Sequence, residues 1–276
     1  MTSSEHGYER PAIAGSGAIA CGVAASVSVI GEVVLLARSE DSASSAIEGA
    51  ASACAKLEGA EKSRIRATTD EAELSECDLI VEAIVEDVEA KAELIARLAE
   101  VAVGADLATT TSSLTIGEIG RRCGHPERVY GLHVFNPVPR MDLIELCLPA
   151  ELSEGIADRA RAWCERIGKR AIEVPDQAGF VVNRLLFPYL FDAVRLAERT
   201  GLEPAAVDDC MTLGAGHPMG PLKLLDFIGL DVAAAIGEAL EADSGEPAHA
   251  PPEALARRVA AGRLGRKSGS GFYEYD

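Results

Sequence analysis

Short apolar runs alternate with longer helical patterns along residues 11 to 174, and this alternation restricts the fold more than any other feature of the chain. The runs read PAIAG, VVLLA, DLIVEAI, DLATTT, VYGLHVF, LIELCL and RAIEVP, with VEAKAELIARLAEVA and SEGIADRARAWCERIG as typical helical patterns between them. Strands that alternate with helices are joined by crossovers, so they pair in parallel and the helices cover both faces of the sheet. An α/β domain with a doubly wound, mostly parallel sheet is predicted.

The pattern changes after the segment VPDQAG, beyond which the strand signals stop. The rest of the chain reads as helices separated by proline and glycine, which are typical of helix starts and ends. We therefore expect two domains, residues 1–178 and residues 179–276, the second of them all-α. The helix expected at residues 180–196 is apolar on most of its faces, which predicts a homodimer joined through the second domain. The side chains that exceed the needs of one small bundle are Phe187, Tyr189, Leu190 and Phe191.

The charge and composition exclude several classes of partner. The formal net charge is −18 at pH 7, and nucleic acids attract basic surfaces, so no nucleic-acid partner is expected. No apolar run approaches the roughly 20 residues that span a bilayer, and the opening MTSSEHGYERPAIAG lacks the apolar core of a secretory signal. A cytoplasmic protein with no membrane partner is expected. The seven cysteines have no C-x-x-C pair and no metal-like spacing, so no metal is predicted.

The first strand-to-helix turn reads AIAGSGAIACG and contains a glycine pattern suited to a dinucleotide. Gly15 and Gly17 allow a tight turn and a close approach of a pyrophosphate to the helix start, and Ala20 takes the third position of the pattern. So short a pattern also occurs in ordinary turns. Its place between a strand and a helix of small residues favours a dinucleotide site on a Rossmann-type domain.

The end of the second expected strand bears on the choice between NAD and NADP. Rossmann domains that bind NAD usually place Asp or Glu about 20 residues after the glycine turn. This chain reads Ala37, Arg38 and Ser39 there. An arginine can bond a 2′-phosphate in a fork, and a serine hydroxyl can add a donor, so Arg38 and Ser39 favour NADP. The alternative is that Arg38 is an ordinary solvated side chain.

Two ionisable residues interrupt apolar runs, His133 in VYGLHVF and Glu145 in LIELCL. A strand buried on both faces reads as a continuous hydrophobic run, so each polar member needs a partner or a function. An imidazole titrates near neutral pH and can accept a proton, while a carboxylate on its second nitrogen fixes the tautomer. The residues are predicted to form either an acid–base pair or a structural pair inside the core.

Seven motifs extend over nearly the whole chain: GSGAIACGVA, VEAIVEDVEAKAEL, TTTSSLTIGEI, GLHVFNPVPRMDLIEL, DQAGFVVNRLLFPYL, GHPMGPLKLLDFIGLD and GRKSGSGFYEY. Their order and spacing resemble those of the 3-hydroxyacyl-CoA dehydrogenases, including the short-chain 3-hydroxybutyryl-CoA enzymes. The resemblance implies an oxidoreductase that exchanges hydride between C3 of an L-3-hydroxyacyl-CoA thioester and a nicotinamide cofactor. It also implies a Rossmann domain followed by a helical domain for dimerisation and substrate binding.

The resemblance assigns roles to individual residues. His133 matches the base that takes the proton from the substrate 3-hydroxyl, and Glu145 matches the glutamate that holds the imidazole. Ser112 matches a serine that hydrogen-bonds the substrate oxygen, and Asn183 matches an asparagine beside the histidine and the substrate. From the residues alone, Ser112 is a strand-end or helix-capping residue and Asn183 is a helix-start residue.

Three further residues match family positions. Glu86 and Lys91 match positions near the nicotinamide ribose and the pyrophosphate, respectively. From the residues alone, Glu86 closes a strand and Lys91 belongs to an exposed, charged helix face. Asn136, in the segment FNP, either orients the substrate or only shapes the turn before Pro137.

Two departures from the family pattern leave alternatives open. The acid on the adenosine ribose is replaced, so the cofactor is NAD or NADP. Residues 40–74 are shorter than the family's helical arm, which helps to hold coenzyme A, and keep Lys56, Lys62, Arg64 and Arg66 as candidates. The same redox step on an acyl carrier protein is the first alternative, although a charge of −18 would repel an acidic carrier. A non-catalytic nucleotide-binding protein on the same fold is the second.

Overall fold

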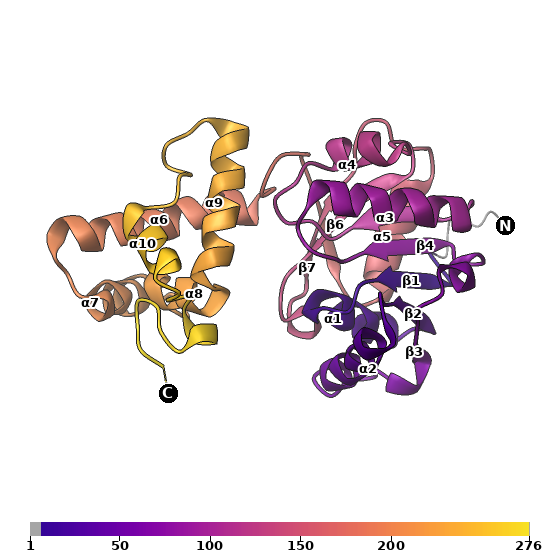
Figure 1. Ribbon diagram of the computed structural model, residues 1–276, viewed down its shortest axis with the longest axis horizontal. Helices are drawn as coiled ribbons and strands as arrows, with labels where there is room; N and C mark the ends of the chain where they lie inside the picture. The colour runs from indigo at the N-terminus through magenta and orange to yellow at the C-terminus, as the bar shows by residue number, and fades with distance from the viewer. Residues whose placement is uncertain (1–6, 276) are drawn as a thin grey trace. The chain divides into compact units, whose positions relative to one another are not determined.

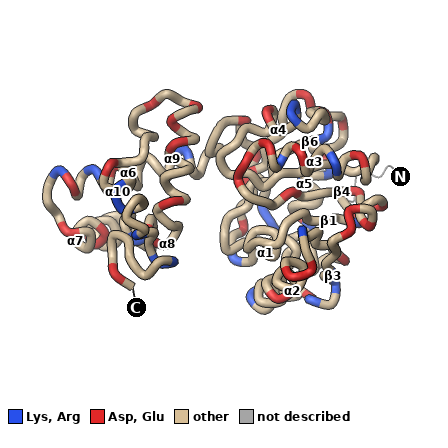
Figure 2. Tube along the Cα trace, in the orientation of Figure 1, with Lys and Arg blue, Asp and Glu red and all other residues tan. Residues whose placement is uncertain are grey.

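The computed structural model describes residues 7–275, so that residues 1–6 and residue 276 lie outside the description. The chain divides into two compact units, Met1–Asp176 and Gln177–Asp276, each with its own hydrophobic core (Figure 1). Acidic positions occur along both units (Figure 2). The expectation about a secretory signal depends partly on residues 1–6 and is not addressed by the structure. No helix within residues 7–275 is long and apolar enough to cross a membrane.

The first unit is built on one eight-stranded sheet in the order β3-β2-β1-β4-β5-β6-β7-β8. The strands are β1 (Pro11–Ala14), β2 (Val33–Leu36), β3 (Ile65–Thr68), β4 (Leu79–Glu82), β5 (Asp106–Thr109), β6 (Val129–Val134), β7 (Leu143–Cys147) and β8 (Arg170–Val174). Neighbouring strands are parallel except β6 and β7, which are antiparallel. The predicted doubly wound, mostly parallel fold is confirmed. The strand order reverses between β1 and β4, where such sheets bind ligands.

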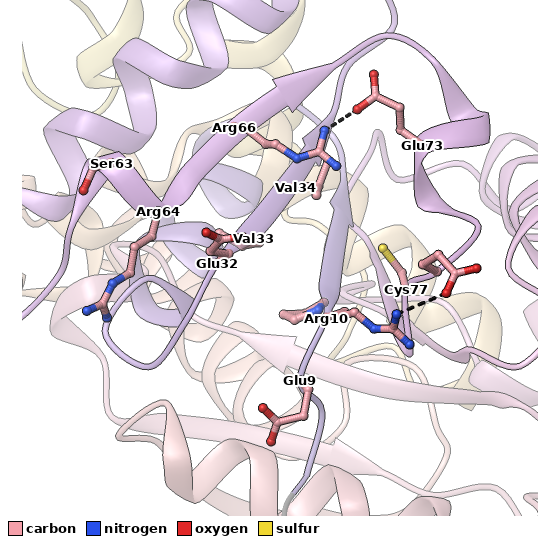
Figure 3. A pocket seen from close by; sticks show the side chains of 12 residues that line it. Glu9, Arg10, Glu32, Val33, Val34, Ser63, Arg64, Arg66, Glu73 and Cys77 are labelled. Carbon is pink, nitrogen blue, oxygen red and sulfur yellow. Dashed lines mark hydrogen bonds and ion pairs between the residues drawn. The ribbon is translucent and has the colours of Figure 1, made fainter.

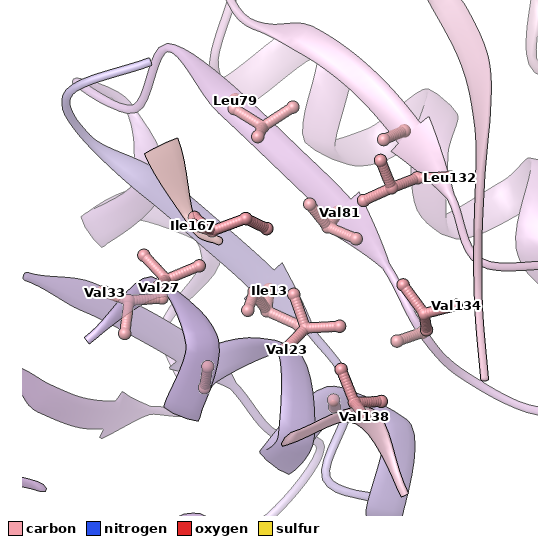
Figure 4. Close-up of a cluster of buried hydrophobic side chains, with 14 of the residues drawn as sticks. Ile13, Val23, Val27, Val33, Leu79, Val81, Leu132, Val134, Val138 and Ile167 are labelled. Carbon is pink, nitrogen blue, oxygen red and sulfur yellow. The ribbon is translucent and has the colours of Figure 1, made fainter. Parts of the chain in front are cut away.

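Helices cover both faces of this sheet. They are α1 (Ala18–Val27), α2 (Glu40–Cys54), α3 (Val88–Val101), α4 (Ile116–Cys123) and α5 (Ile156–Arg166). The main core cluster packs α1, α2 and α5 against the sheet. Figure 4 shows the part of this cluster that contains Val23 of α1 and the strand residues Val81 and Leu132. Successive residues of a strand point to opposite faces, so Glu82 and His133 point to the other face, which α3 and α4 cover. Glu145 shares that face because it is paired in register with His133.

The strand β3, which lies at the edge of the sheet, was not among the strands predicted from the sequence. Ile65 and Thr68 are its buried residues, and the exposed Arg66 interrupts any apolar run. Edge strands are short and often carry charged side chains, which removes the hydrophobic signal that marks the inner strands. Residues 40–74, which the sequence likened to a shortened arm, form α2, a 3-10 turn at Lys62–Arg64, this strand and a second 3-10 turn at Glu71–Leu74.

The second unit is helical, as predicted. Its helices are α6 (Val182–Thr200), α7 (Pro204–Asp209), α8 (Pro221–Ile228), α9 (Leu230–Ser244) and α10 (Glu253–Ala260). The side chains from which a dimer was predicted, Phe187, Tyr189, Leu190 and Phe191, all pack in or against the core of this unit. These side chains therefore give no reason to expect a dimer, because the unit itself buries Phe187, Leu190 and Phe191 and partly buries Tyr189. Different apolar side chains are exposed, among them Leu185 on α6 and Leu213 after α7.

Candidate active site

The turn between β1 and α1 has the geometry that a pyrophosphate needs. Gly15 has a φ of +151°, and a Cβ there would overlap the carbonyl oxygen of Ala83, which follows β4. Gly17 is the N-cap of α1 without a side-chain capping bond, and a Cβ on it would meet nothing within 4 Å. The start of α1 is therefore uncovered, and a helix N-terminus attracts anions. Ala20 is fully buried against Gly15, so this turn fits a dinucleotide.

Arg38 and Ser39 follow β2 beside this turn, where the amide of Gly15 donates a 2.9 Å hydrogen bond to the carbonyl oxygen of Leu36. Ser39 is the N-cap of α2, and its hydroxyl oxygen accepts a 3.3 Å hydrogen bond from the amide of Ser42. The Ser39 hydroxyl thus caps α2, a role that was not predicted from the sequence. Arg38 is exposed, and it forms no ion pair within the part of the chain that the structure describes.

His133 and Glu145 are cross-strand neighbours on the antiparallel pair β6 and β7. The Nδ1 atom of His133 and the Oε2 atom of Glu145 are 2.6 Å apart, and the two side chains are 5% and 2% exposed. The ring of Phe135 packs 4.5 Å from the imidazole, measured between centroids. The carboxylate engages Nδ1, and a carboxylate on one ring nitrogen fixes the tautomer of an imidazole. The geometry is that of a base oriented by a carboxylate.

Glu86 and Lys91 are placed differently from what the residues alone indicated. The strand β4 ends at Glu82, so Glu86 lies in the following loop and does not close the strand. Lys91 is 1% exposed and does not belong to a solvated face, because it lies on the inward stripe of α3 with Ile95 and Leu98. Its Nζ atom lies 2.9 Å from Glu82 Oε1 and 3.3 Å from Glu86 Oε2. Lys91 is a buried cation between two carboxylates.

Ser112 is half-buried in the loop after β5, which Glu86 holds in place. Glu86 Oε1 accepts hydrogen bonds from the amides of Ser112 and Ser113 at 2.7 and 2.9 Å. The Thr111 hydroxyl donates to the same oxygen at 2.7 Å. Burial raises the pKa of the Glu86 carboxyl, but Lys91 and these hydrogen bonds outweigh burial and hold the pKa below its usual value. Glu86 is therefore an ionised anchor for the loop at neutral pH.

The exposed Asn136 lies in the loop between β6 and β7, which Lys169 supports. Lys169 is 6% exposed, and its ammonium donates to the carbonyl oxygens of Val138 and Met141 at 2.7 and 2.9 Å. Burial lowers the pKa of Lys169. Val138 also packs on α1, where a Cβ at Gly22 would lie 2.7 Å from the Val138 Cβ. The loop of Asn136 is thus held against α1. Lys169 was not predicted as a site residue, and the only sequence signal for its role is that a lysine directly precedes a strand.

Asn183 belongs to the second unit. It lies in the first turn of α6 and is 8% exposed. Gly179, shortly before this helix, has a φ of +72°, and a Cβ there would lie 2.5 Å from the Leu240 side chain. The glycine of the motif GFVVNR is therefore required by the fold of this unit. Among residues 7–275, no group of three or more His, Cys, Asp or Glu side chains could hold a metal ion.

A cavity of about 400 Å³ lies at the opposite end of the strands, near the start of β1, β2 and β3 (Figure 3). Its lining includes Arg64 and Arg66, two of the residues considered for binding coenzyme A. Ion pairs join Arg10 to Glu76 at 3.2 Å, Arg64 to Glu61 at 2.6 Å, and Arg66 to Glu73. Carboxylates already balance these arginines, which argues against a role in holding the phosphates of a carrier.

A Rossmann-type sheet with an uncovered glycine turn and a carboxylate-oriented histidine defines a dehydrogenase that uses a nicotinamide dinucleotide. Residues 11–177 match the family model of the 3-hydroxyacyl-CoA dehydrogenase NAD-binding domain, and residues 179–275 match the model of the C-terminal domain. The chain belongs to the 3-hydroxyacyl-CoA dehydrogenase family, as its motifs predicted. It is an oxidoreductase with a nicotinamide cofactor.

Named relatives and solved structures agree with this family. A 3-hydroxybutyryl-CoA dehydrogenase of Mycobacterium tuberculosis is 42% identical over 211 residues, which cover 75% of this chain and 74% of the relative. The human mitochondrial hydroxyacyl-coenzyme A dehydrogenase is 41% identical over 77% of this chain and 69% of its own length. The crystal structure of an (S)-3-hydroxybutyryl-CoA dehydrogenase from Ralstonia eutropha has a TM-score of 0.91 at 31% identity, with 98% and 99% of the two chains covered.

Proposed function

We propose that the protein is a short-chain L-3-hydroxyacyl-CoA dehydrogenase, with a thioester like 3-hydroxybutyryl-CoA as its substrate. The observation that carries this proposal is the buried pair of His133 and Glu145, whose Nδ1 and Oε2 atoms are 2.6 Å apart. The pair shares its sheet with a glycine turn that fits a dinucleotide. The substrate class is supported by the M. tuberculosis relative named 3-hydroxybutyryl-CoA dehydrogenase, at 42% identity.

The chemistry follows from the pair. In oxidation, His133 removes the proton of the 3-hydroxyl while the C3–H bond breaks, and in reduction it returns the proton to the oxygen. The bound nicotinamide supplies the acceptor or the donor of the hydride. Glu145 stabilises the imidazolium that forms and keeps the imidazole in the tautomer that works through Nε2. In this structure the Ser112 hydroxyl donates to Glu86 Oε1 at 3.2 Å. When substrate binds, the hydroxyl turns and donates instead to the substrate oxygen, on which charge develops.

The cofactor assignments form a second part of the proposal. Gly15, Gly17 and Ala20 receive the pyrophosphate at the start of α1. Glu86 lies beside the nicotinamide ribose. Lys91 contributes there through Glu86 and not at the pyrophosphate, because its ammonium is buried and contacts two carboxylates.

The remaining assignments concern the substrate and the location. Asn183 supplies an amide, which can both donate and accept a hydrogen bond, and Asn136 orients the substrate from the loop after β6. The cytoplasmic location expected from the sequence stays a prediction.

A spectrophotometric assay of acetoacetyl-CoA reduction, run side by side with NADH and NADPH, tests the function. Steady turnover is the expected result. A higher kcat/KM on acetoacetyl-acyl carrier protein would favour the carrier as substrate, which the net charge of −18 opposes. Cofactor binding without turnover of either thioester would show a non-catalytic nucleotide-binding protein.

The same assay tests the cofactor preference. We expect NADPH to be preferred by about tenfold to a hundredfold in kcat/KM, because hydrogen bonds from Arg38 to a 2′-phosphate contribute roughly 1.5 to 3 kcal/mol. Arg38→Ala should remove the preference, whereas Arg97→Ala, at an arginine 55% exposed on α3, should keep it. Equal use of both cofactors by the wild type, or a loss of both alike in Arg38→Ala, would show that Arg38 does not bind the phosphate.

We propose a homodimer whose interface contains exposed leucines of the second unit. Leu185 is 71% exposed and Leu213 is 85% exposed, and isolated apolar side chains of this size gain from burial in an interface. Introducing Leu185→Asp and Leu213→Asp together should raise the dimer dissociation constant by on the order of 10² or more, because two leucines are lost from each copy. Light scattering at micromolar concentration measures the mass.

Val103→Asp is the matched control for this variant, since Val103 is 76% exposed in the first unit and should leave the dimer intact. A wild-type monomer would contradict the proposal. So would a double variant that keeps the mass of a dimer.

A further inference from the structure

We propose that Glu82, at the end of β4, is a positioning residue for the reaction and acts on Ser112 through a buried chain of alternating charges. The chain runs from Glu82 to Lys91 and from Lys91 to Glu86, which holds the loop of Ser112. The inference rests on the proposed function, in which Ser112 donates to the substrate oxygen.

Glu82 is a fully buried carboxylate whose two oxygens both accept hydrogen bonds. Its Oε1 accepts from Lys91 Nζ at 2.9 Å and from the amide of Ile84 at 2.7 Å. Its Oε2 accepts from the Thr109 hydroxyl at 2.6 Å and from Lys91 Nζ at 3.1 Å. Thr109 is the register partner of Glu82 on β5. Lys91 donates to both oxygens of Glu82, so the amide nitrogen of a glutamine at position 82 would face the Lys91 ammonium, which is itself a donor. The site therefore requires a carboxylate.

Lys91 connects Glu82 at the end of β4 with Glu86 in the loop that follows. Its ammonium contacts both oxygens of Glu82 and, at 3.3 Å, the Oε2 atom of Glu86. A buried ammonium is strongly unfavourable unless it is paired, so these carboxylates determine where it lies. The two contacts to Glu82 hold Lys91 where it reaches only one oxygen of Glu86.

Glu86 uses its two oxygens for different partners. Oε2 faces Lys91, and Oε1 faces the loop after β5. The donors to Oε1 are the hydroxyls of Thr111, Ser112 and Ser113 and the amides of Ser112 and Ser113, at 2.7 to 3.2 Å. The ammonium therefore orients the carboxylate, and the carboxylate orients the loop. A rotation of the Glu86 carboxylate would therefore change the hydrogen bonds that hold Ser112.

Removing the charge of Glu82 changes the electrostatic forces on the Lys91 ammonium. In Glu82→Gln, Lys91 retains one full counter-charge, that of Glu86, and is drawn toward it. The ammonium then competes with the loop for the oxygens of Glu86. A misplacement of about 1 Å at a reacting centre can lower a rate by on the order of 10². We expect kcat for acetoacetyl-CoA reduction to fall by about 10- to 100-fold, with little change in KM for the thioester.

A double-mutant cycle separates positioning from plain structural support. In the Ser112→Ala variant the hydroxyl that Glu82 is proposed to position is absent. Adding Glu82→Gln to this variant should therefore lower kcat by less than about threefold more. Asp106→Asn is the matched control, because Asp106 is a buried carboxylate held by Arg159 at 2.8 and 2.9 Å, at the opposite end of β5. Asp106→Asn should lower Tm and leave kcat unchanged. In combination with Ser112→Ala, the effects of the two substitutions should be additive.

Hydrogen exchange gives a readout that does not depend on activity. The amides of Ser112 and Ser113 donate to Glu86, so a peptide covering residues 110–115 should exchange faster in Glu82→Gln and at the wild-type rate in Asp106→Asn. If Glu82→Gln cannot be purified, Glu82→Asp replaces it in the same double-mutant cycle and the same exchange experiment. Aspartate keeps the negative charge, but its side chain is one methylene shorter, so its oxygens lie farther from Lys91.

The outcomes distinguish the two proposals. Wild-type protein that does not reduce acetoacetyl-CoA would defeat the proposed function, while the exchange data would still decide whether Glu82 holds the loop. Normal kcat in the folded Glu82 variant would overturn the positioning role. An equal loss of kcat in the Ser112→Ala background, or unchanged exchange of the loop, would overturn it as well.

Discussion

Replacement of His133 by glutamine is expected to lower kcat by on the order of 10² to 10⁴, the usual contribution of a positioned general base. Glutamine is close to histidine in size and can hydrogen-bond Glu145, but it cannot take up the substrate proton at neutral pH. The fold and the dissociation constant for the reduced cofactor should stay close to wild type. Steady-state kinetics, with cofactor binding followed by fluorescence, measures both effects.

His249→Gln is the matched control for this substitution. His249 is also buried, at 5% exposure, and its Nδ1 atom lies 2.5 Å from the Ser244 hydroxyl in the second unit. The control should keep kcat near wild type even if it lowers Tm. Turnover close to wild type in a folded His133→Gln protein would remove His133 from the mechanism.

Gly17→Asp is expected to weaken binding of the reduced cofactor by on the order of 10², because a carboxylate at the start of α1 repels a pyrophosphate and takes the amides that would bind it. The fold should survive, since a Cβ at Gly17 meets nothing within 4 Å. Aspartate is also a favourable N-cap, so Tm should not fall. Fluorescence titration and a thermal melt give the two measurements.

Gly104→Asp serves as the control, because a Cβ at Gly104 also meets nothing within 4 Å and the residue precedes β5, at the end of the sheet opposite the glycine turn. It adds the same charge to the same unit without approaching α1. If both variants bind the cofactor like the wild type, the glycine turn does not receive the pyrophosphate.

The inner strands, the glycine turn and the pairing of His133 with Glu145 could be predicted because each leaves a signal in a short stretch of sequence. An ionisable residue inside an apolar run stands out, and two such runs in succession suggest a pair. The strand β3 could not be found in this way, because Arg66 breaks its apolar pattern at the sheet edge. Family resemblance supplied the roles of Ser112 and Asn183, which have no distinctive local signal.

Lys91 shows why burial of a charged residue is hard to predict. Its spacing to Ile95 and Leu98 is that of a buried helix stripe, so the periodicity did contain the signal. Lysine is rarely fully buried, and the partner that permits burial here, Glu82, ends an apolar strand nine residues earlier. Propensity and pattern describe single segments, whereas this burial depends on a contact between two of them.

The antiparallel pairing of β6 and β7 has a consequence for how His133 and Glu145 come together. His133 and Glu145 are separated by 12 positions, and the entropy lost on closing a loop grows with its length. The parallel pair of β1 and β4 instead joins Ala12 to Ile80 across a much longer stretch of chain. The contact between His133 and Glu145 is therefore a low-contact-order element in a fold whose other strand pairings are mostly long-range, and it can form early and locally.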